Sequence, residues 1–233
     1  MNITSQDRFL GCLLGLAAGD AVGTAVEFMP RGSFVPVTDM LGGGPFHLKP
    51  GQWTDDTSMA LCLTESFIEK QGFDASDQME RYIRWYRDGH LSSTGRCFDI
   101  GNATSDALRR YEGTGEPFSG STDPRSAGNG SLMRLAPIPM FCYPDIDKAI
   151  QYAAESSRTT HGAAECVDAS KLYAYMLAKA LDGKSKTEIL SAPDSTNRGT
   201  CRTPRGFRLK PETTRGSARE NGGCCAREGF WPA

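Results

Sequence analysis

Two adjacent carboxylates lie between two threonines in the segment Thr54-Asp55-Asp56-Thr57. Carboxylate and hydroxyl oxygens are the hard ligands that Mg2+ and Mn2+ prefer in proteins. Threonine and aspartate are also typical of the first turn of a helix, where they cap backbone N–H groups and complement the helix dipole. The segment therefore predicts either a divalent cation site that uses Thr54, Asp55 and Asp56 or a helix start without a metal.

A second polar group follows at Asp99, Asn102 and Asp106, which are spaced as i, i+3 and i+7. This spacing places three residues on one face of a helix. Gly101 lies between them and permits close approach of another group. The pattern fits a cleft-facing helix as well as an ordinary solvated helix face.

A glycine-rich turn, Gly128-Asn129-Gly130-Ser131, leads into apolar sequence. Backbone N–H groups in such a turn can hold phosphate oxygens, although a plain loop has the same composition. His161 precedes a long alanine-rich segment and has no ligand spacing to the other two histidines. An isolated histidine at a helix start is more often structural than catalytic.

The elements around these residues read as helices. Apolar residues recur with helical spacing after Ser5, and Gly11, Gly15, Gly19 and Gly23 recur every fourth residue, which predicts a helix packed closely against a neighbour. Glu27 continues this spacing and is expected to face that neighbour. Further helices are expected from Thr54 to about Lys70, from Ser76, from Asp99 to Gly113, from Asp145 and from Gly162 to Leu181. Patterns typical of strands are scarce, so the sequence predicts an all-α domain with long loops at 28–53, 88–98 and 113–130.

The chain changes character near Pro193. Residues 194–233 carry a net charge of +4 against −6 for residues 1–193, and Leu209 is their only Val, Ile, Leu or Met. Such a segment buries too little apolar surface to offset its ordering entropy. We expect an incomplete helical domain over residues 1–193 and a disordered basic tail over 194–233, or a change of reading frame near residue 193.

Composition excludes several classes of protein. The 233 residues are 39% hydrophobic and 23% charged, with a net charge of −2, which gives no electrostatic reason to expect nucleic acid as a partner. The apolar stretch Phe9–Gly19 is shorter than the roughly 20 residues that span a bilayer, and no basic region precedes it. We therefore expect a cytoplasmic protein without a membrane segment, in which the eight cysteines are free thiols.

Taken together and in this order, these segments resemble the ADP-ribosylglycohydrolase family. The matching stretches are Arg8–Gly11, Gly19–Glu27, Thr54–Thr57, Phe98–Asn102, Gly128–Arg134 and Thr160-His161. The resemblance implies an all-α fold with a two-metal cleft that holds Mg2+ or Mn2+. It implies an ADP-ribosylated protein or a small ADP-ribosyl compound as the substrate.

The resemblance also implies roles for single residues. Thr54, Asp55 and Asp56 correspond to metal ligands, and Glu27 corresponds to the catalytic acid beside the scissile bond. Asp99, a second catalytic candidate, and Asn102 correspond to positions near the ribose and its leaving group. The ADP portion is expected against the residues Gly128, Asn129, Gly130, Ser131 and His161.

The sequence departs from the family pattern in one respect. The family completes its metal site with a late Asp-x-Asp-Thr/Ser motif, and no such motif follows Leu190. At most one weakly held cation is therefore expected. Three functions stay open: an ADP-ribosylglycohydrolase, a non-catalytic ADP-ribose binder that keeps the fold, and a metal-dependent phosphate hydrolase that uses Asp55 and Asp56 alone.

Overall fold

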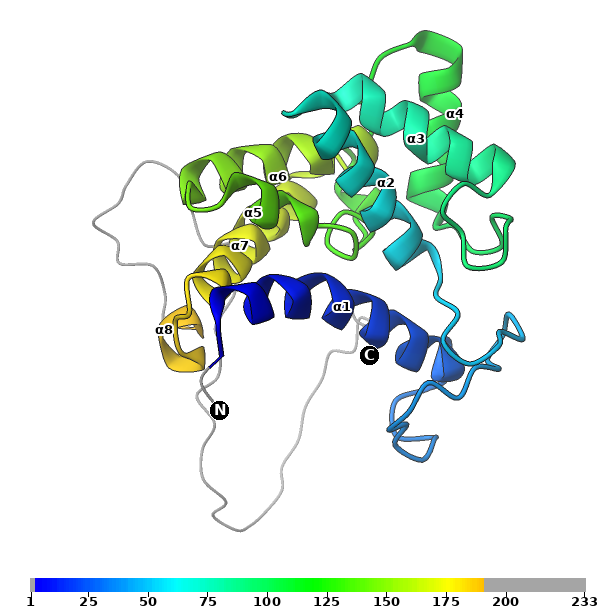
Figure 1. Ribbon diagram of the computed structural model, residues 1–233. Coiled ribbons are helices and arrows are strands. Elements are labelled where there is room, and N and C mark those ends of the chain that lie inside the picture. Colours follow the sequence, from blue (N-terminus) through cyan, green and yellow to red (C-terminus); the bar gives the residue numbers. More distant parts are fainter. Residues whose placement is uncertain (1–2, 191–233) are drawn as a thin grey trace, which may run out of the picture.

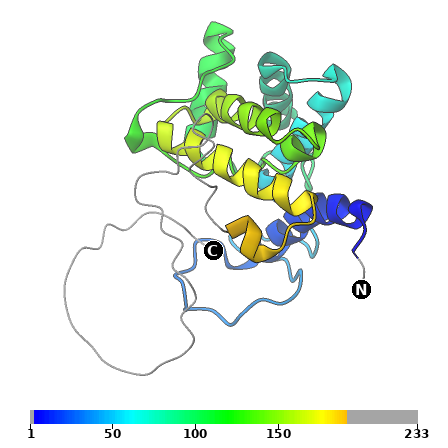
Figure 2. The same cartoon turned by 90° about the vertical axis from the view of Figure 1, so that its left-hand side faces the viewer.

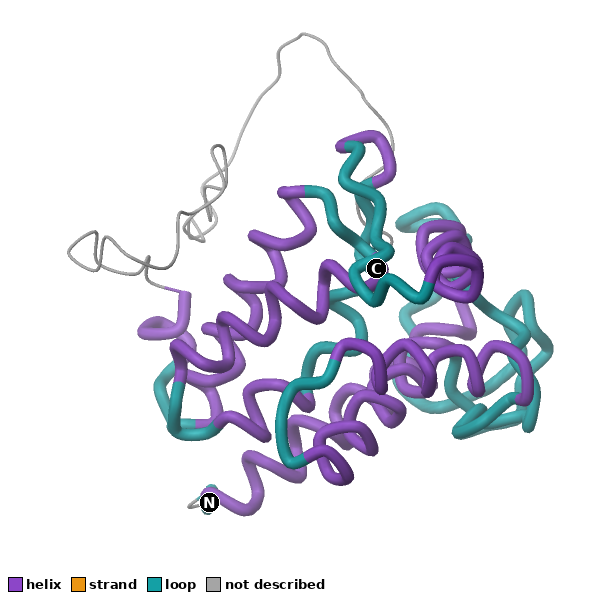
Figure 3. Tube along the Cα trace, turned by 90° about the horizontal axis from the view of Figure 1, so that it is seen from above, coloured by secondary structure: helices purple, strands orange, loops and turns teal. Residues whose placement is uncertain are grey.

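The computed structural model describes residues 3–190, and within that range it contains helices and loops but no strand (Figure 3). The α-helices are α1 Ser5–Gly23, α2 Asp55–Lys70, α3 Ala75–Asp88, α4 Asn102–Thr114, α5 Pro137–Cys142, α6 Ile146–Thr160, α7 Ala164–Leu181 and α8 Lys186–Leu190. Two short 3-10 helices, η1 Thr24–Val26 and η2 Pro124–Ser126, lie in the connections. The all-α prediction is confirmed, and the predicted tail at 194–233 lies outside the described residues.

Helix starts follow local capping, with three differences from the sequence prediction. Thr4, and not Ser5, caps α1 through a reciprocal pair of hydrogen bonds with Asp7. Asp74, and not Ser76, caps α3. Helix α4 begins at Asn102 after Gly101, so Asp99 precedes the helix, and its predicted helical face with Asn102 and Asp106 is wrong.

Two apolar clusters share α2 and divide the described helices between them. One contains Leu63, Phe67, Ile138, Ala153 and Ala174, and joins α2 to α5, α6 and α7. The other contains Met59, Met79, Tyr82, Trp85 and Leu108, and joins α2 to α3 and α4. Because α2 contributes to both clusters, it is packed from two sides (Figure 1).

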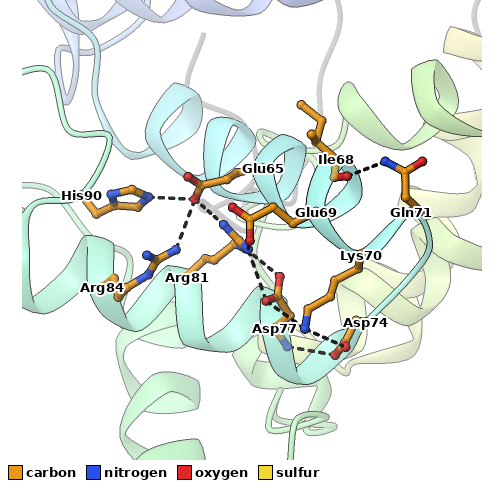
Figure 4. Close-up of polar contacts among 10 residues, drawn as sticks. All are labelled: Glu65, Ile68, Glu69, Lys70, Gln71, Asp74, Asp77, Arg81, Arg84 and His90. Carbon is orange, nitrogen blue, oxygen red and sulfur yellow. Dashed lines mark hydrogen bonds and ion pairs between the residues drawn. The ribbon is translucent and has the colours of Figure 1, made fainter.

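A charged network reinforces the contact between α2 and α3. The Arg81 guanidinium lies among the carboxylates of Glu65, Glu69 and Asp77 (Figure 4). Arg81 is only 3% exposed, so its charge is compensated by these three acids rather than by water. His90 also contacts Glu65, at 2.8 Å from its Nε2 atom.

Helix α1 lies below α2 to α7 in Figure 1, and α8 lies beside the start of α1. Arg8 fixes the start of α1 to the end of α7 by donating to the Leu181 carbonyl oxygen at 2.8 Å. A Cβ atom built on Gly11, Gly15, Gly19 or Gly23 would meet no atom within 4 Å. The expected close neighbour on this glycine face is therefore absent from the described residues.

By length and composition alone, the segment Ser5–Val26 could cross a membrane, and 11% of its most apolar window is buried against the rest of the described chain. A signal sequence or the core helix of a soluble protein meets the same test. The expectation of no membrane segment therefore stays a prediction. The five cysteines within residues 3–190 are free thiols, as expected.

Candidate functional site

The N-terminal turn of α2 is capped by a carboxylate from another helix. Thr54 occupies the capping position, but its own side chain makes no capping hydrogen bond. Instead Asp20 of α1 accepts hydrogen bonds from the backbone N–H groups of Thr54 and Thr57, both at 3.0 Å. The Thr54 and Thr57 hydroxyls donate to the same carboxylate at 2.8 and 2.7 Å. Asp20 therefore fixes the turn that carries Asp55 and Asp56.

The sequence patterns assign no role to Asp20. The available signal is that Asp20 is the only charged residue between Phe9 and Val26. A lone carboxylate in an apolar helix needs hydrogen-bonding partners, which the α2 turn supplies. Because the Thr54 hydroxyl donates its hydrogen bond to Asp20, the lone pairs on Thr54 Oγ1 stay available to a cation or a substrate.

Carboxyl groups from three separate segments gather around this turn. The Asp55 and Asp99 carboxyl groups lie within hydrogen-bonding reach of each other. Burial, followed by repulsion from neighbouring acids that include Asp56 and Asp99, raises the pKa of Asp55. Burial also raises the pKa of Asp99, with Asp20 adding to the effect.

Glu27 belongs to the same group, although it does not lie on α1. The helix ends at Gly23, η1 follows, and Glu27 comes directly after it, so the expected continuation of the glycine spacing is wrong. Burial, then repulsion from Asp99, Asp56 and Asp20, raises the pKa of Glu27 to about 7. Burial and repulsion from Asp20 likewise raise the pKa of Asp56 to about 7.

We call Asp20, Glu27, Asp55, Asp56 and Asp99 the carboxylate cluster. Its oxygen donors, and the raised pKa values of Glu27, Asp55, Asp56 and Asp99, suit a hard divalent cation, which would supply the missing positive charge. Within residues 3–190, however, no group of three acidic, histidine or cysteine side chains has the arrangement of a metal site. The donor chemistry fits Mg2+ or Mn2+, but the described residues provide an incomplete ligand set.

The predicted nucleotide-binding residues lie around a second centre, at His161. A Cβ atom on Gly130 would meet His161 Cε1 at 2.6 Å, and one on Gly128 would meet Nε2 at 3.4 Å. The glycines therefore let the turn lie directly on the imidazole ring. The Thr160 hydroxyl contacts His161 Nδ1 at 2.8 Å, and burial, followed by the charge of Arg134, lowers the pKa of His161 to about 3. His161 is thus neutral at pH 7.

The other two residues of this turn differ in their exposure. Asn129 is exposed, and its side chain is accessible to a ligand. Ser131 is buried, and its hydroxyl contacts those of Ser157 and Ser170 at 3.0 and 3.1 Å. The Ser131 side chain therefore ties the turn to α6 and α7. Asn102, the first residue of α4, is also exposed.

Arg134 connects the two centres, and the sequence patterns give it no role. It is 0% exposed, and no carboxylate within residues 3–190 forms an ion pair with it. Its guanidinium donates to the carbonyl oxygens of Gly130 and Ser156 at 3.4 and 3.1 Å and to the Thr160 hydroxyl at 2.8 Å. It also lies over the Tyr82 ring, 4.7 Å from the centroid. Arg134 therefore holds the glycine-rich turn against α6.

Comparison with known proteins gives a consistent result. A family model described as ADP-ribosylglycohydrolase matches residues 1–220. The chain is 48% identical over 185 residues to an ADP-ribosylarginine hydrolase Tri1 of Pseudomonas putida (strain GB-1), covering 79% of this chain and 50% of that protein. It is 42% identical over 141 residues to an ADP-ribosyl-[dinitrogen reductase] glycohydrolase of Rhodospirillum rubrum, covering 57% of this chain and 44% of that protein.

A solved structure described as an ADP-ribosylglycohydrolase-related protein complex is similar, with a TM-score of 0.70 and 48% identity. The match covers 80% of this chain and 60% of the solved chain. The chain spans about half the length of the curated relatives it matches. The family match extends over most of the sequence and agrees with the helical fold, so the chain belongs to the ADP-ribosylglycohydrolase family.

Proposed function

We propose that this chain acts in hydrolysis of the glycosidic bond between ADP-ribose and a modified arginine side chain. The observation that carries the proposal is the carboxylate cluster at the start of α2, in a chain of this family. The names of the relatives from Pseudomonas putida and Rhodospirillum rubrum support an ADP-ribosylated substrate.

We assign Glu27 the role of general base or acid at the scissile bond. Cleavage of an anomeric bond develops positive charge on the ribose, and water must lose a proton as it adds to the anomeric carbon. The half-buried Glu27 carboxylate can take that proton, the departing guanidine keeps the electron pair of the broken C–N bond, and the proton then passes from Glu27 to the guanidine. We propose that Asp99, a member of the cluster, and Asn102, three residues further along the chain, orient the ribose hydroxyls.

We propose Thr54, Asp55 and Asp56 as the ligands that this chain offers to Mg2+ or Mn2+. A bound divalent cation would polarise the reacting water and hold ribose hydroxyls. Asp20 keeps these ligands in one turn by binding both flanking threonines. The ADP portion would lie on the backbone of the Gly128–Ser131 turn and beside Asn129, with neutral His161 underneath.

A second candidate function is ADP-ribose binding without turnover. It is favoured by the absence, within residues 3–190, of a group of three side chains arranged as a metal site. The glycine-rich turn and His161 do not depend on that ligand set. Binding and hydrolysis must therefore be measured separately.

The test incubates the full chain and ADP-ribosylated arginine with 1 mM Mn2+ and measures released ADP-ribose. Glu27→Gln should abolish release and leave ADP-ribose affinity in calorimetry within about twofold, because the substitution preserves shape and removes the ionisable group. Glu155→Gln, on α6, is the matched control and should retain release. Equal release by Glu27→Gln would contradict the assignment, and binding without release by the wild type would select the second function.

A further inference from the structure

The rings of three phenylalanines form a row beside the carboxylate cluster. Phe28 and Phe46 meet edge to face with their centroids 6.2 Å apart, and Phe46 meets Phe98 in the same way at 5.3 Å. We call these three residues the aromatic row. Phe28 and Phe46 lie in the connection from α1 to α2, and Phe98 lies in the connection from α3 to α4. In Figures 1 and 2 the first of these connections lies at the C-terminal end of α1, outside the packed helices.

The two ends of the aromatic row are joined to two members of the carboxylate cluster. Phe28 directly follows Glu27, and Phe98 directly precedes Asp99. The Glu27 and Asp99 carboxylates are close enough that repulsion between them helps to raise the pKa of Glu27. The rings and the acids therefore lie together at the candidate site.

Phe28 is held in an exposed and strained conformation. It is 71% exposed. Its φ angle is +63°, in the left-handed region that residues other than glycine rarely adopt. An exposed ring gains little from the hydrophobic effect, so burial does not compensate for this strain. Strained positions of this kind cluster at ligand-binding and active sites, which makes Phe28 a candidate for contact with a ligand.

The aromatic row has no positively charged partner within the described residues. The cation–π contacts in residues 3–190 use six other rings, of which Tyr82 beside Arg134 is one. The face of an aromatic ring carries partial negative charge, and the neighbouring carboxylates add to the negative potential. Phe28, the exposed member of the row, is therefore placed to receive a cation from a ligand.

The rings distinguish between cations that the acids alone would accept. Mg2+ and Mn2+ are hard ions that bind oxygen ligands, and a phenyl ring offers them no such donor. A guanidinium is planar, delocalised and weakly hydrated, so it stacks on an aromatic face while its N–H groups donate to carboxylates. Rings beside carboxylates therefore match a guanidinium in both respects.

We propose that the aromatic row binds the guanidinium of the modified arginine, and that Phe28 determines specificity for this group over an uncharged acceptor. The inference rests on the proposed function, because it assigns the leaving-group side of the same reaction. The ADP portion has its own place at the Gly128–Ser131 turn. Because Phe28 directly follows Glu27, a guanidinium on its ring lies beside the carboxyl group that exchanges protons with the water and the leaving nitrogen.

The test titrates the full chain with Nα-acetylarginine methylamide and with the matching citrulline derivative, whose urea group has a similar shape and no charge. NMR chemical shifts measure binding without substrate or turnover. The wild type should bind the arginine derivative more tightly. Phe28→Leu should weaken that binding about two- to fivefold, the effect of losing one exposed cation–π contact, and should leave the citrulline derivative unaffected. Phe28→Trp should match or exceed the wild type, because indole is the best of the aromatic rings at binding cations.

Tyr173→Leu, which removes a 40% exposed ring from α7, is the control and should leave binding unchanged. Equal affinity of the wild type for the two derivatives, no measurable binding of either, or equal weakening by Phe28→Leu and Phe28→Trp would overturn the proposal. A loss of ADP-ribose affinity on Phe28→Leu, measured by calorimetry, would also overturn it and would assign the ring to the adenine base. Binding of the arginine derivative through Phe28, without release of ADP-ribose from ADP-ribosylated arginine, would contradict the proposed hydrolysis and not the role of Phe28.

Discussion

The carboxylates at the two ends of α2 have opposite electrostatic surroundings. Near its C-terminal end, Glu65 and Glu69 surround the Arg81 guanidinium together with Asp77 of α3 (Figure 4). Despite partial burial, hydrogen bonds from His90 and Arg81 lower the pKa of Glu65. At the N-terminal end, Asp55 and Asp56 meet further acids, neither forms an ion pair within residues 3–190, and their pKa values are raised.

This difference separates structural acids from candidate functional ones. Glu65 and Glu69 lie on the same helix as Asp55 and Asp56, so their location on α2 does not by itself explain the difference. The chain supplies a buried cation where carboxylates only hold helices together. At the start of α2 it places carboxyl groups beside one another. Their mutual repulsion lowers the stability of the folded chain, and a bound cation could relieve it.

The largest expected effect is at the compensated end. Arg81→Met should lower the free energy of unfolding by about 3 kcal/mol, because it leaves partly buried carboxylates without their cation. The value lies at the lower end of the usual range because Glu69 is largely exposed. Urea denaturation measures the loss. Arg84→Met is the control: Arg84 pairs with Glu65 at 3.3 Å on the surface, and its loss should cost under about 1 kcal/mol.

The second effect concerns the acid that organises the other end. Asp20→Asn keeps one acceptor oxygen but loses the charge that binds two N–H groups and two hydroxyls, so it should cost about 2 kcal/mol. Asp106→Asn, an exposed residue of α4, should change stability by less than about 0.5 kcal/mol. If the two variants unfold at the same urea concentration, Asp20 does not hold the turn.

A third prediction separates pH effects near the two centres. The pKa of His161 falls from about 6.5 in the unfolded chain to about 3 in the folded chain, so between these values the unfolded chain binds the extra proton. Stability from His161 is full above pH 6.5 and is lost as the pH falls, by about 2 kcal/mol at pH 5. Glu27, Asp55, Asp56 and Asp99 act with the opposite sign, because their raised pKa values make the folded chain bind more protons.

The effect of His161 is measured as the difference in unfolding free energy between the wild type and His161→Gln at each pH. Their unfolding free energies should converge by about 2 kcal/mol between pH 7 and pH 5. Equal pH dependence in the two proteins would show that His161 is not held neutral by the fold.

The fourth effect should be of opposite direction to the first. Asp55→Asn removes an ionisable carboxyl group from the uncompensated end and keeps a group able to donate a hydrogen bond to Asp99. In the absence of divalent cations it should raise stability at pH 7, by up to about 1 kcal/mol, because it relieves repulsion. A loss as large as that of Arg81→Met would mean that the Asp55 charge is compensated in the folded chain.

Much of the fold follows from local sequence patterns, because capping residues and helical spacing act within a few residues. The start of α6 after Asp145 is confirmed for this reason. The predicted start of α4 is wrong, since the sequence pattern does not distinguish Asp99 from Gly101 as the residue before the helix.

The candidate site depends on contacts that no local pattern contains. The hydrogen bonds of Asp20 with Thr54 and Thr57 join residues that are 34 and 37 positions apart in the sequence. The glycine spacing of α1 predicts a close neighbour, but spacing alone cannot specify which segment provides it. The sequence predicts a phosphate-binding role for Gly130, and the structure adds a second reason for the glycine, the His161 ring beneath it. The metal ligands and nucleotide contacts stay predictions.

The smallest expected effect tests whether the uncompensated end binds a cation at all. A site with a dissociation constant of about 1 mM stabilises the folded chain by only about 0.4 kcal/mol in 1 mM Mn2+, since the gain is RT ln(1 + [L]/Kd). We expect a gain of this size in thermal unfolding, reversed by EDTA. Asp55→Asn/Asp56→Asn should abolish it, because both carboxylate ligands are lost. Glu69→Gln, at the other end of α2, should preserve it, because Glu69 faces Arg81 and not the cluster.

A gain of about 4 kcal/mol, which corresponds to a dissociation constant a thousandfold below the Mn2+ concentration, would show that the chain completes the ligand set by itself. An equal gain in the double variant would place the cation elsewhere and remove the functional interpretation of the difference between the two ends of α2.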